Sequence, residues 1–154
     1  MNARSFFKTA CLALLAAVVS AGNGFAGYGD IIDPTKVGEK VILKPGAKGR
    51  IEFEQNGNEL TKSRWIADSK EEKKGTSIDF AQEQGKKPDD KYFMLYIKNY
   101  LPKKLTYRAA IRTAGSRSFR ETSLIVPLDS GMGCYESWPD KIEEMLLFGF
   151  KLVD

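Results

Sequence analysis

The 154-residue chain contains no histidine, and only one of its two cysteines, Cys134, lies outside the amino-terminal leader described below. Without an imidazole, no nucleophile can pass its proton to a histidine base, so Ser-His-Asp and Cys-His catalytic arrangements are excluded. Histidine-ligated zinc, copper and haem are excluded as well, and a single cysteine is too few for a thiolate metal site. The sequence therefore predicts neither a metal nor another cofactor.

The chain also lacks an apolar run of the ~20 residues that a membrane-spanning helix needs. Its amino terminus has a shorter one: Arg4 and Lys8 are followed by small and apolar residues over positions 10–20, and small residues surround a possible cleavage point after Ala26. This order is typical of a secretory signal peptide. We therefore expect a cleaved signal peptide over residues 1–26 and a protein that is periplasmic or secreted.

The remaining residues, 27–154, have a length suited to a single domain. Removing the leader lowers the formal net charge from +4 to about +2, too little to indicate a nucleic-acid-binding protein. With Cys134 as the single mature cysteine, no intramolecular disulfide is possible. That thiol is buried, reactive or bonded to another chain, and burial is the reading we favour because free cysteine behaves as a small apolar residue.

The clearest periodic pattern runs from Tyr92 to Thr113. Apolar residues alternate with other residues in two runs that are separated by Tyr100-Leu101-Pro102-Lys103-Lys104. Alternation of period two indicates β-strands with one buried face. The residues expected to face inward are Phe93, Leu95, Ile97, Leu105, Tyr107, Ala109 and Ile111. Because a proline and two lysines interrupt the pattern, we predict a hairpin connection between these two strands.

Similar short patterns elsewhere predict strands near residues 37–44, 50–55, 59–67, 78–80, 119–128 and 145–153. In the last of these, Leu146, Phe148, Phe150 and Leu152 should share one face. No long helical pattern is present. This spacing predicts an all-β fold, specifically an antiparallel, immunoglobulin-like sandwich of about seven or eight short strands. The paired cysteines of antibody domains are absent, and no family motif is matched closely enough to name.

The first candidate site is the irregular stretch over residues 129–140, which we expect to form a binding loop. Its candidate contact residues are Met132, Cys134, Tyr135, Glu136 and Trp138. Glycines let such a loop fold tightly, and aromatic side chains offer large contact areas at low entropic cost. The alternative is that Trp138 and Tyr135 cover one end of the core, with Cys134 buried beneath them.

The second candidate is a basic face formed by Lys103, Lys104, Arg108 and Arg112. Arg108 and Arg112 should point outward from the same strand, and guanidinium groups suit carboxylates, phosphates and sulfates. Such a face would bind an acidic glycan, a lipid headgroup or an acidic protein. The alternative is an ordinary solvated strand face, because protein surfaces are commonly a quarter charged or more.

Enzymatic readings have weaker support in the sequence. Glu52 and Glu54 share a strand face without an evident cleft, and Ser137 and Lys141 are four apart on an expected helical turn. We therefore predict an exported, non-enzymatic β-sandwich that binds another macromolecule, in the manner of an inhibitor, an immunity protein or an accessory subunit. A protein partner is favoured. The alternatives are a small hydrolase using carboxylates or a Ser-Lys pair, and a module that binds acidic glycan or lipid.

Overall fold

The computed structural model describes residues 28–68, 75–84 and 91–154, which form ten β-strands. The strands are β1 (Ile31–Ile32), β2 (Lys40–Leu43), β3 (Ala47–Asn56), β4 (Glu59–Ala67), β5 (Thr76–Gln84), β6 (Lys91–Asn99), β7 (Lys104–Thr113), β8 (Phe119–Thr122), β9 (Gly133–Trp138) and β10 (Ile142–Val153). The all-β prediction is confirmed. None of the described residues forms a helix able to cross a membrane, and the expected signal peptide lies outside the described residues.

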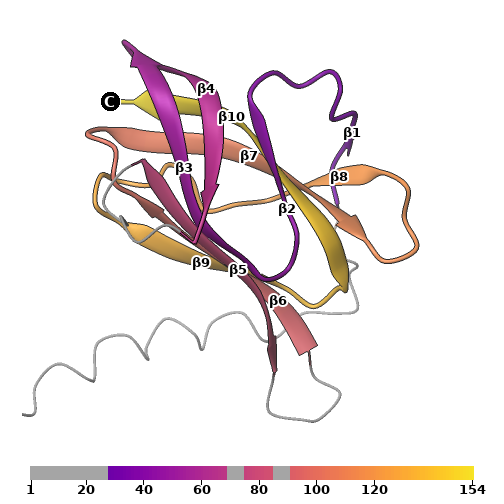
Figure 1. Cartoon of the computed structure of the whole chain (residues 1–154). Coiled ribbons are helices and arrows are strands. Elements are labelled where there is room, and N and C mark those ends of the chain that lie inside the picture. The colour runs from indigo at the N-terminus through magenta and orange to yellow at the C-terminus, as the bar shows by residue number, and fades with distance from the viewer. Residues whose placement is uncertain (1–27, 69–74, 85–90) are drawn as a thin grey trace, which may run out of the picture.

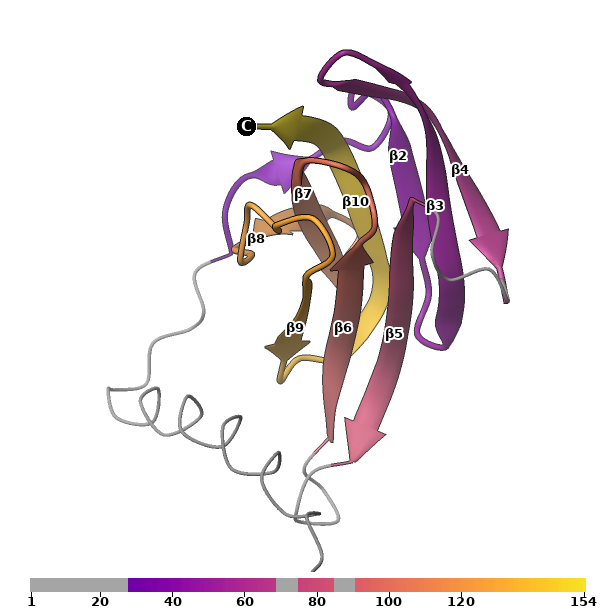
Figure 2. The same cartoon turned by 90° about the vertical axis from the view of Figure 1, so that its left-hand side faces the viewer.

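All strands belong to one antiparallel sheet in the order β1-β8-β7-β10-β4-β3-β5-β6-β9, with β2 also paired to β10. The sheet is strongly curved but not closed: β9, β6 and β5 lie across from β7 and β10 (Figures 1 and 2). The finer prediction of an immunoglobulin-like sandwich with seven or eight strands is therefore not confirmed. Hydrogen bonding connects ten strands into one continuous sheet.

The main core fills the space inside this curve. All seven residues predicted to face inward from the Tyr92–Thr113 segment are buried there, with exposures of 3% or less. They meet side chains from the other strands, including Leu43, Ile51, Phe80 and Leu147. Because both halves of the sheet contribute, neither half would have a buried face without the other.

The predicted hairpin between the two central strands is wrong. β6 pairs with β5 and β9, whereas β7 pairs with β8 and β10, so β6 and β7 are not hydrogen-bonded to each other. Residues 100–103 carry the chain from one half of the sheet to the other. Alternation shows which side chains face the core, but it does not identify the neighbouring strand.

The side chain of Asn99 secures this crossover. It is 0% exposed, and its Nδ2 donates hydrogen bonds to the carbonyl oxygens of Lys103 at 2.8 Å and Leu128 at 3.0 Å. Its Oδ1 accepts from the Leu101 N–H at 2.9 Å. The Asn99 backbone N–H also donates to the Met132 carbonyl at 2.9 Å. One buried amide thus joins the end of β6, the start of β7 and the segment that leads into β9.

The predicted common face of β10 is also wrong. Leu147, Phe150 and Leu152 lie in the main core, whereas Leu146 and Phe148 lie in a second cluster on the opposite face. That second cluster contains Ala110, Phe119, Leu146 and Phe148. Gly149 has φ +65°, and the pairing with β7 shifts between Phe148 and Lys151. This β-bulge inserts one residue and so reverses which side chains face inward.

Two other segments differ from expectation. The strand predicted over residues 119–128 ends at Thr122, and the stretch predicted to be an irregular loop contains β9. In the strand predicted over residues 50–55, alternation with Ile51 and Phe53 would direct Arg50 into solvent, but its side chain is only 7% exposed. Its guanidinium bonds to Glu52, which also binds Arg64 at 2.6 Å.

Replacing Asn99 with alanine should lower the free energy of unfolding by about 3 kcal/mol, because three hydrogen bonds are lost: those to the carbonyls of Lys103 and Leu128 and the one from the Leu101 N–H. Urea unfolding followed by tryptophan fluorescence measures this. The matched control is Gln55→Ala, which removes an exposed amide-to-carbonyl hydrogen bond to Gly57 and should cost no more than ~0.5 kcal/mol. Equal losses in the two variants would show that Asn99 does not secure the crossover.

Candidate functional site

Strand β9 is an edge strand of the sheet. Among the described strands only β6 pairs with it, in a register that sets Cys134 opposite Ile97 and Tyr135 opposite Tyr96. Figure 2 shows β9 beside β6 with its other side unoccupied by a described strand. This strand contains four of the five residues proposed for the first candidate site, so their placement follows from strand alternation.

The even-numbered side chains of β9 point toward the interior. Trp138 is 7% exposed, belongs to the main core and donates from its indole N–H to the Thr122 hydroxyl at 2.8 Å. Cys134 is partly buried and packs against the same core. Glu136 is half-buried. Trp138 and Cys134 therefore occupy the core positions that the alternative interpretation assigned to them.

The side chain of Tyr135 points the other way and is 63% exposed. Its ring centroid lies 4.6 Å from that of Tyr96 on β6. Gly133 makes this arrangement possible, because a Cβ at that position would approach the Tyr96 hydroxyl to 2.7 Å. Tyr96 thus lies across the glycine and holds the Tyr135 ring from one side. Met132, just before the strand, is 57% exposed.

Exposed apolar side chains gather around this strand. Six large hydrophobic residues are exposed in the described part of the chain, and four of them lie between positions 125 and 135. Ile125 and Val126 complete the set, with exposures of 62% and 38%. Ile125 is held next to β9 because its backbone N–H donates to the Glu136 carboxylate at 2.5 Å. We call Tyr96, Ile125, Val126, Met132 and Tyr135 the β9 patch.

The pKa values of the ionisable groups on the inner side of β9 do not favour nucleophilic chemistry. Burial raises the pKa of the Cys134 thiol to about 11, and the Glu136 carboxylate acts in the same direction. Burial also raises the pKa of Glu136, although the Ile125 N–H opposes that shift. Cys134 is consequently a protonated thiol at neutral pH, which is a poor nucleophile.

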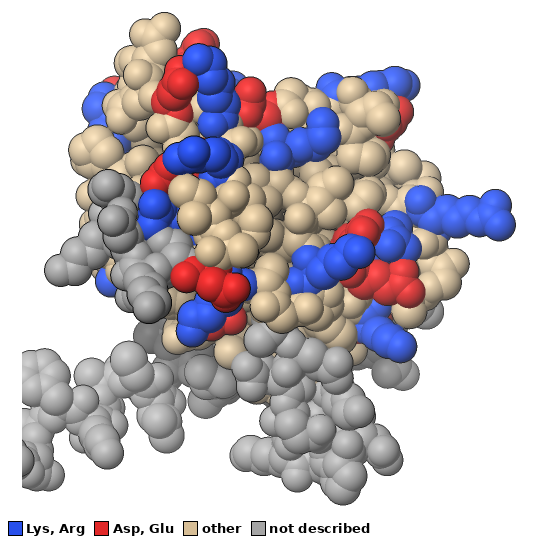
Figure 3. Space-filling model, in the orientation of Figure 1, with Lys and Arg blue, Asp and Glu red and all other residues tan. Residues whose placement is uncertain are grey.

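The two arginines of the predicted basic face are each paired with carboxylates from a neighbouring strand. Arg108 forms two hydrogen bonds with Glu121 on β8, at 2.6 and 2.7 Å. Arg112 binds Glu143 at 2.5 Å and Glu144 at 3.1 Å, both on β10. Basic and acidic groups are correspondingly interspersed on the face shown in Figure 3. The guanidinium groups already have anionic partners within the sheet.

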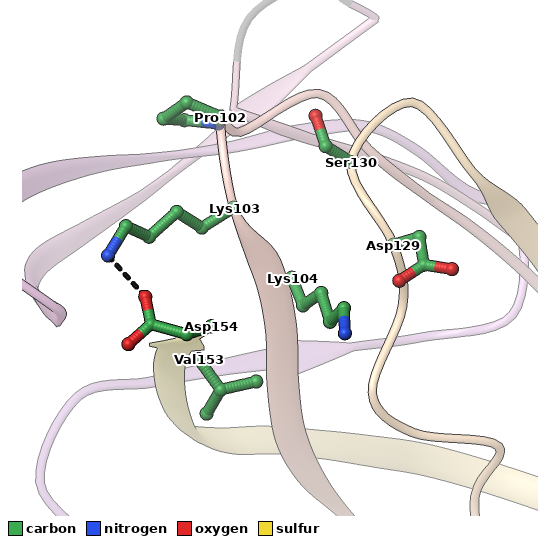
Figure 4. A pocket seen from close by; sticks show the side chains of 7 residues that line it. All are labelled: Pro102, Lys103, Lys104, Asp129, Ser130, Val153 and Asp154. Carbon is green, nitrogen blue, oxygen red and sulfur yellow. Dashed lines mark hydrogen bonds and ion pairs between the residues drawn. The ribbon is translucent and has the colours of Figure 1, made fainter.

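The two lysines of the predicted basic face lie at the start of β7, beside a pocket of about 310 Å³. The residues that line this pocket are Pro102, Lys103, Lys104, Asp129, Ser130, Val153 and Asp154 (Figure 4). Lys103 binds the Asp154 carboxylate at 2.6 Å and the Asn58 side chain at 3.0 Å. Both members of the Lys103–Asp154 pair are more than 40% exposed, so this ion pair contributes little to stability.

The residues considered for catalysis do not converge. Glu52 is held by Arg50 and Arg64, whose hydrogen bonds keep the pKa of its carboxyl low. Ser137 lies on β9 rather than on the expected helical turn. No group of three or more acidic or cysteine side chains that could hold a metal occurs within the described ranges.

Comparison with protein-family models, curated proteins and solved structures finds no match for the chain. The geometry of the β9 patch therefore carries the functional argument. The sequence analysis proposed Met132 and Tyr135 as contact residues, and both are exposed, but it did not include Tyr96, Ile125 or Val126. Tyr96 was recognisable only as an outward-facing strand residue, and no local pattern indicated that residues 125–126 would lie beside β9.

The raised pKa of Glu136 predicts a defined pH dependence. The folded state binds this proton more tightly than the unfolded state, so the contribution of Glu136 to stability falls as pH rises from ~4.3 through the raised pKa. Glu136→Gln cannot lose a proton. Its melting temperature, relative to the wild type, should therefore increase between pH 4 and pH 8 in calorimetric scans.

Glu121→Gln is a control for which we expect the opposite dependence of melting temperature on pH. Arg108 lowers the pKa of Glu121, so the stability that this carboxylate contributes is present above its unfolded pKa and is lost as pH falls. The melting temperature of Glu121→Gln relative to the wild type should decrease as pH rises. The same trend in both variants would contradict the assignment of Glu136.

Proposed function

We propose that this protein is a non-enzymatic binding protein that recognises another macromolecule through the β9 patch. The observation that carries the proposal is Tyr135, whose ring is 63% exposed and yet supported by Tyr96 at 4.6 Å. An isolated exposed tyrosine would be unremarkable on a protein surface. A tyrosine held by a second ring, with Met132 exposed just before the same strand and Ile125 exposed beside it, is typical of an interaction site.

The physical advantage of this arrangement is a low entropic cost of binding. Tyrosine has few rotatable bonds, and the contact with Tyr96 restricts Tyr135 before a partner arrives. Met132 is flexible and can adapt to the shape of the partner. Aromatic anchors surrounded by weaker contacts account for most of the binding energy in many protein interfaces.

A protein partner is favoured over an acidic glycan or a lipid headgroup. Arg108 and Arg112 would have to leave Glu121, Glu143 and Glu144 before they could bind another anion. The β9 patch needs no such exchange, because its side chains are apolar or aromatic. We also retain export as part of the proposal, on the basis of the leader-like pattern over residues 1–26.

We also infer that the fold is a two-layered β-sandwich. The two halves of the curved sheet serve as the two layers of a sandwich, with β3, β5, β6 and β9 on one side and β7, β8 and β10 on the other. The support is a shared core to which both halves contribute. Such a scaffold presents β9 from a rigid base, as binding sites generally require.

The double variant Met132→Ala/Tyr135→Ala should lose at least tenfold in affinity for the partner while keeping the wild-type melting temperature, since both side chains are exposed. The partner is first captured from the exported fraction with the wild-type protein as bait and then titrated calorimetrically. The matched control is Ile31→Ala, which removes a side chain of 60% exposure on β1 and should bind normally.

Trp138→Ala serves as the stability reference. It removes a core side chain and its hydrogen bond to Thr122, and it should lower the free energy of unfolding by about 3–5 kcal/mol. Two results would count against the β9 patch: unchanged binding by the double variant, or unfolding of the double variant on the scale of Trp138→Ala.

A further inference from the structure

Strand β9 exposes backbone hydrogen-bonding groups as well as side chains. The Asn99 N–H points to β9, where it donates to the Met132 carbonyl, and the Tyr100 N–H points the other way, to the Gly75 carbonyl beyond β5. Backbone groups in an antiparallel ladder alternate in direction. Applied to β9, this alternation leaves the N–H and C=O groups of Gly133, Tyr135 and Ser137 directed away from β6. All three residues are exposed.

We propose that this edge pairs with the same edge of a second copy of the chain. The two β9 strands would run antiparallel about a twofold axis through Tyr135. Tyr135 then faces its counterpart, and Gly133 faces Ser137 of the other copy. Because positions 133, 135 and 137 all direct their backbone groups outward, this register pairs each donor with an acceptor. The two sheets would become one continuous sheet.

The occupant is a second copy because β9 is complementary to itself. Its single charged residue is Glu136, and the proposed register sets Glu136 opposite Cys134 of the other copy rather than opposite another carboxylate. The edge has no lysine or proline between Gly133 and Trp138, the residues that commonly protect exposed edges from pairing. The exposed Ile125 and Val126 flank the edge and would be partly covered by their counterparts.

The area available indicates a weak dimer. Six residues per copy form a smaller contact than the roughly 1,600 Å² of a standard protein interface, so we expect a dissociation constant on the order of 10 μM. Dimerisation is a different interaction from the proposed partner binding, because it depends on the backbone groups of β9, although it would also partly cover Ile125 and Val126 of the β9 patch. It would bring two Tyr96–Tyr135 pairs together on one surface.

Analytical ultracentrifugation of the purified exported protein from 1 to 200 μM tests the proposal. The wild type should change from monomer to dimer within this range. Ser137→Pro removes one outward N–H and should weaken dimerisation at least tenfold, whereas Ser137→Ala keeps that N–H and should dimerise normally. Tyr135→Lys sets two positive charges opposite each other and should also weaken it, more strongly at low salt than at high salt.

Cysteine crosslinking tests the register. In a Cys134→Ser background, Tyr135→Cys places two thiols at directly paired positions with a Cα separation of ~5.5 Å, which suits a disulfide. Ser137→Cys is the matched control, since its two copies would lie roughly 13 Å apart in this register. The first variant should form a covalent dimer under mild oxidation, and the second should not.

A wild type that stays monomeric at 200 μM would overturn the proposal. So would dimers that tolerate both Ser137→Pro and Tyr135→Lys, or that crosslink equally through positions 135 and 137. If Ser137→Pro does not fold, as judged by a lost thermal transition, Tyr135→Lys and the crosslinks decide. Partner binding without dimerisation would leave the proposed function standing, and dimerisation without partner binding would leave the self-pairing standing.

Discussion

The fold depends on a crossover that is fixed by one buried amide. Asn99, at the end of β6, binds backbone groups of Leu101 and Lys103 in the crossover and of Leu128 in the segment before β9. Inside a low-dielectric core each unsatisfied carbonyl would be costly, so the amide orients all three segments at once. Through them it determines that β6 and β7 belong to opposite halves of the sheet, and that the core lies between those halves.

The position of β9 follows from this constraint. The segment tied to Asn99 leads directly into Gly133, so β9 pairs with β6 and becomes the margin of the sheet. This edge strand has one face in the core and the other in solvent. Trp138 and Tyr135 illustrate the consequence, because residues three apart in one short strand have exposures of 7% and 63%. Core packing and an exposed aromatic side chain are thereby combined in six residues.

Electrostatics distinguish the β9 patch from the rest of the described surface. Arg108, Arg112 and Arg64 each bind a carboxylate on their own or an adjacent strand, and such pairs serve mainly to satisfy one another. Tyr135 instead lies against the Tyr96 ring, with the exposed Met132 just before the strand, and the one carboxylate of β9, Glu136, is turned inward. The proposed partner would gain mainly from desolvating these apolar and aromatic side chains.

The sequence alone determined the all-β class, most strand positions and the inward faces of β6 and β7, because period-two alternation is a local property of the chain. That Met132 and Tyr135 contact a partner stays a prediction from the sequence, and both side chains are exposed. Only the tertiary structure decided which strands are neighbours, since pairing depends on contacts between distant residues such as Asn99 and Leu128. The same reason applies to the β-bulge at Gly149, which changes which β10 side chains face the core, and to the contact of Ile125 with β9. No local sequence pattern predicts either feature.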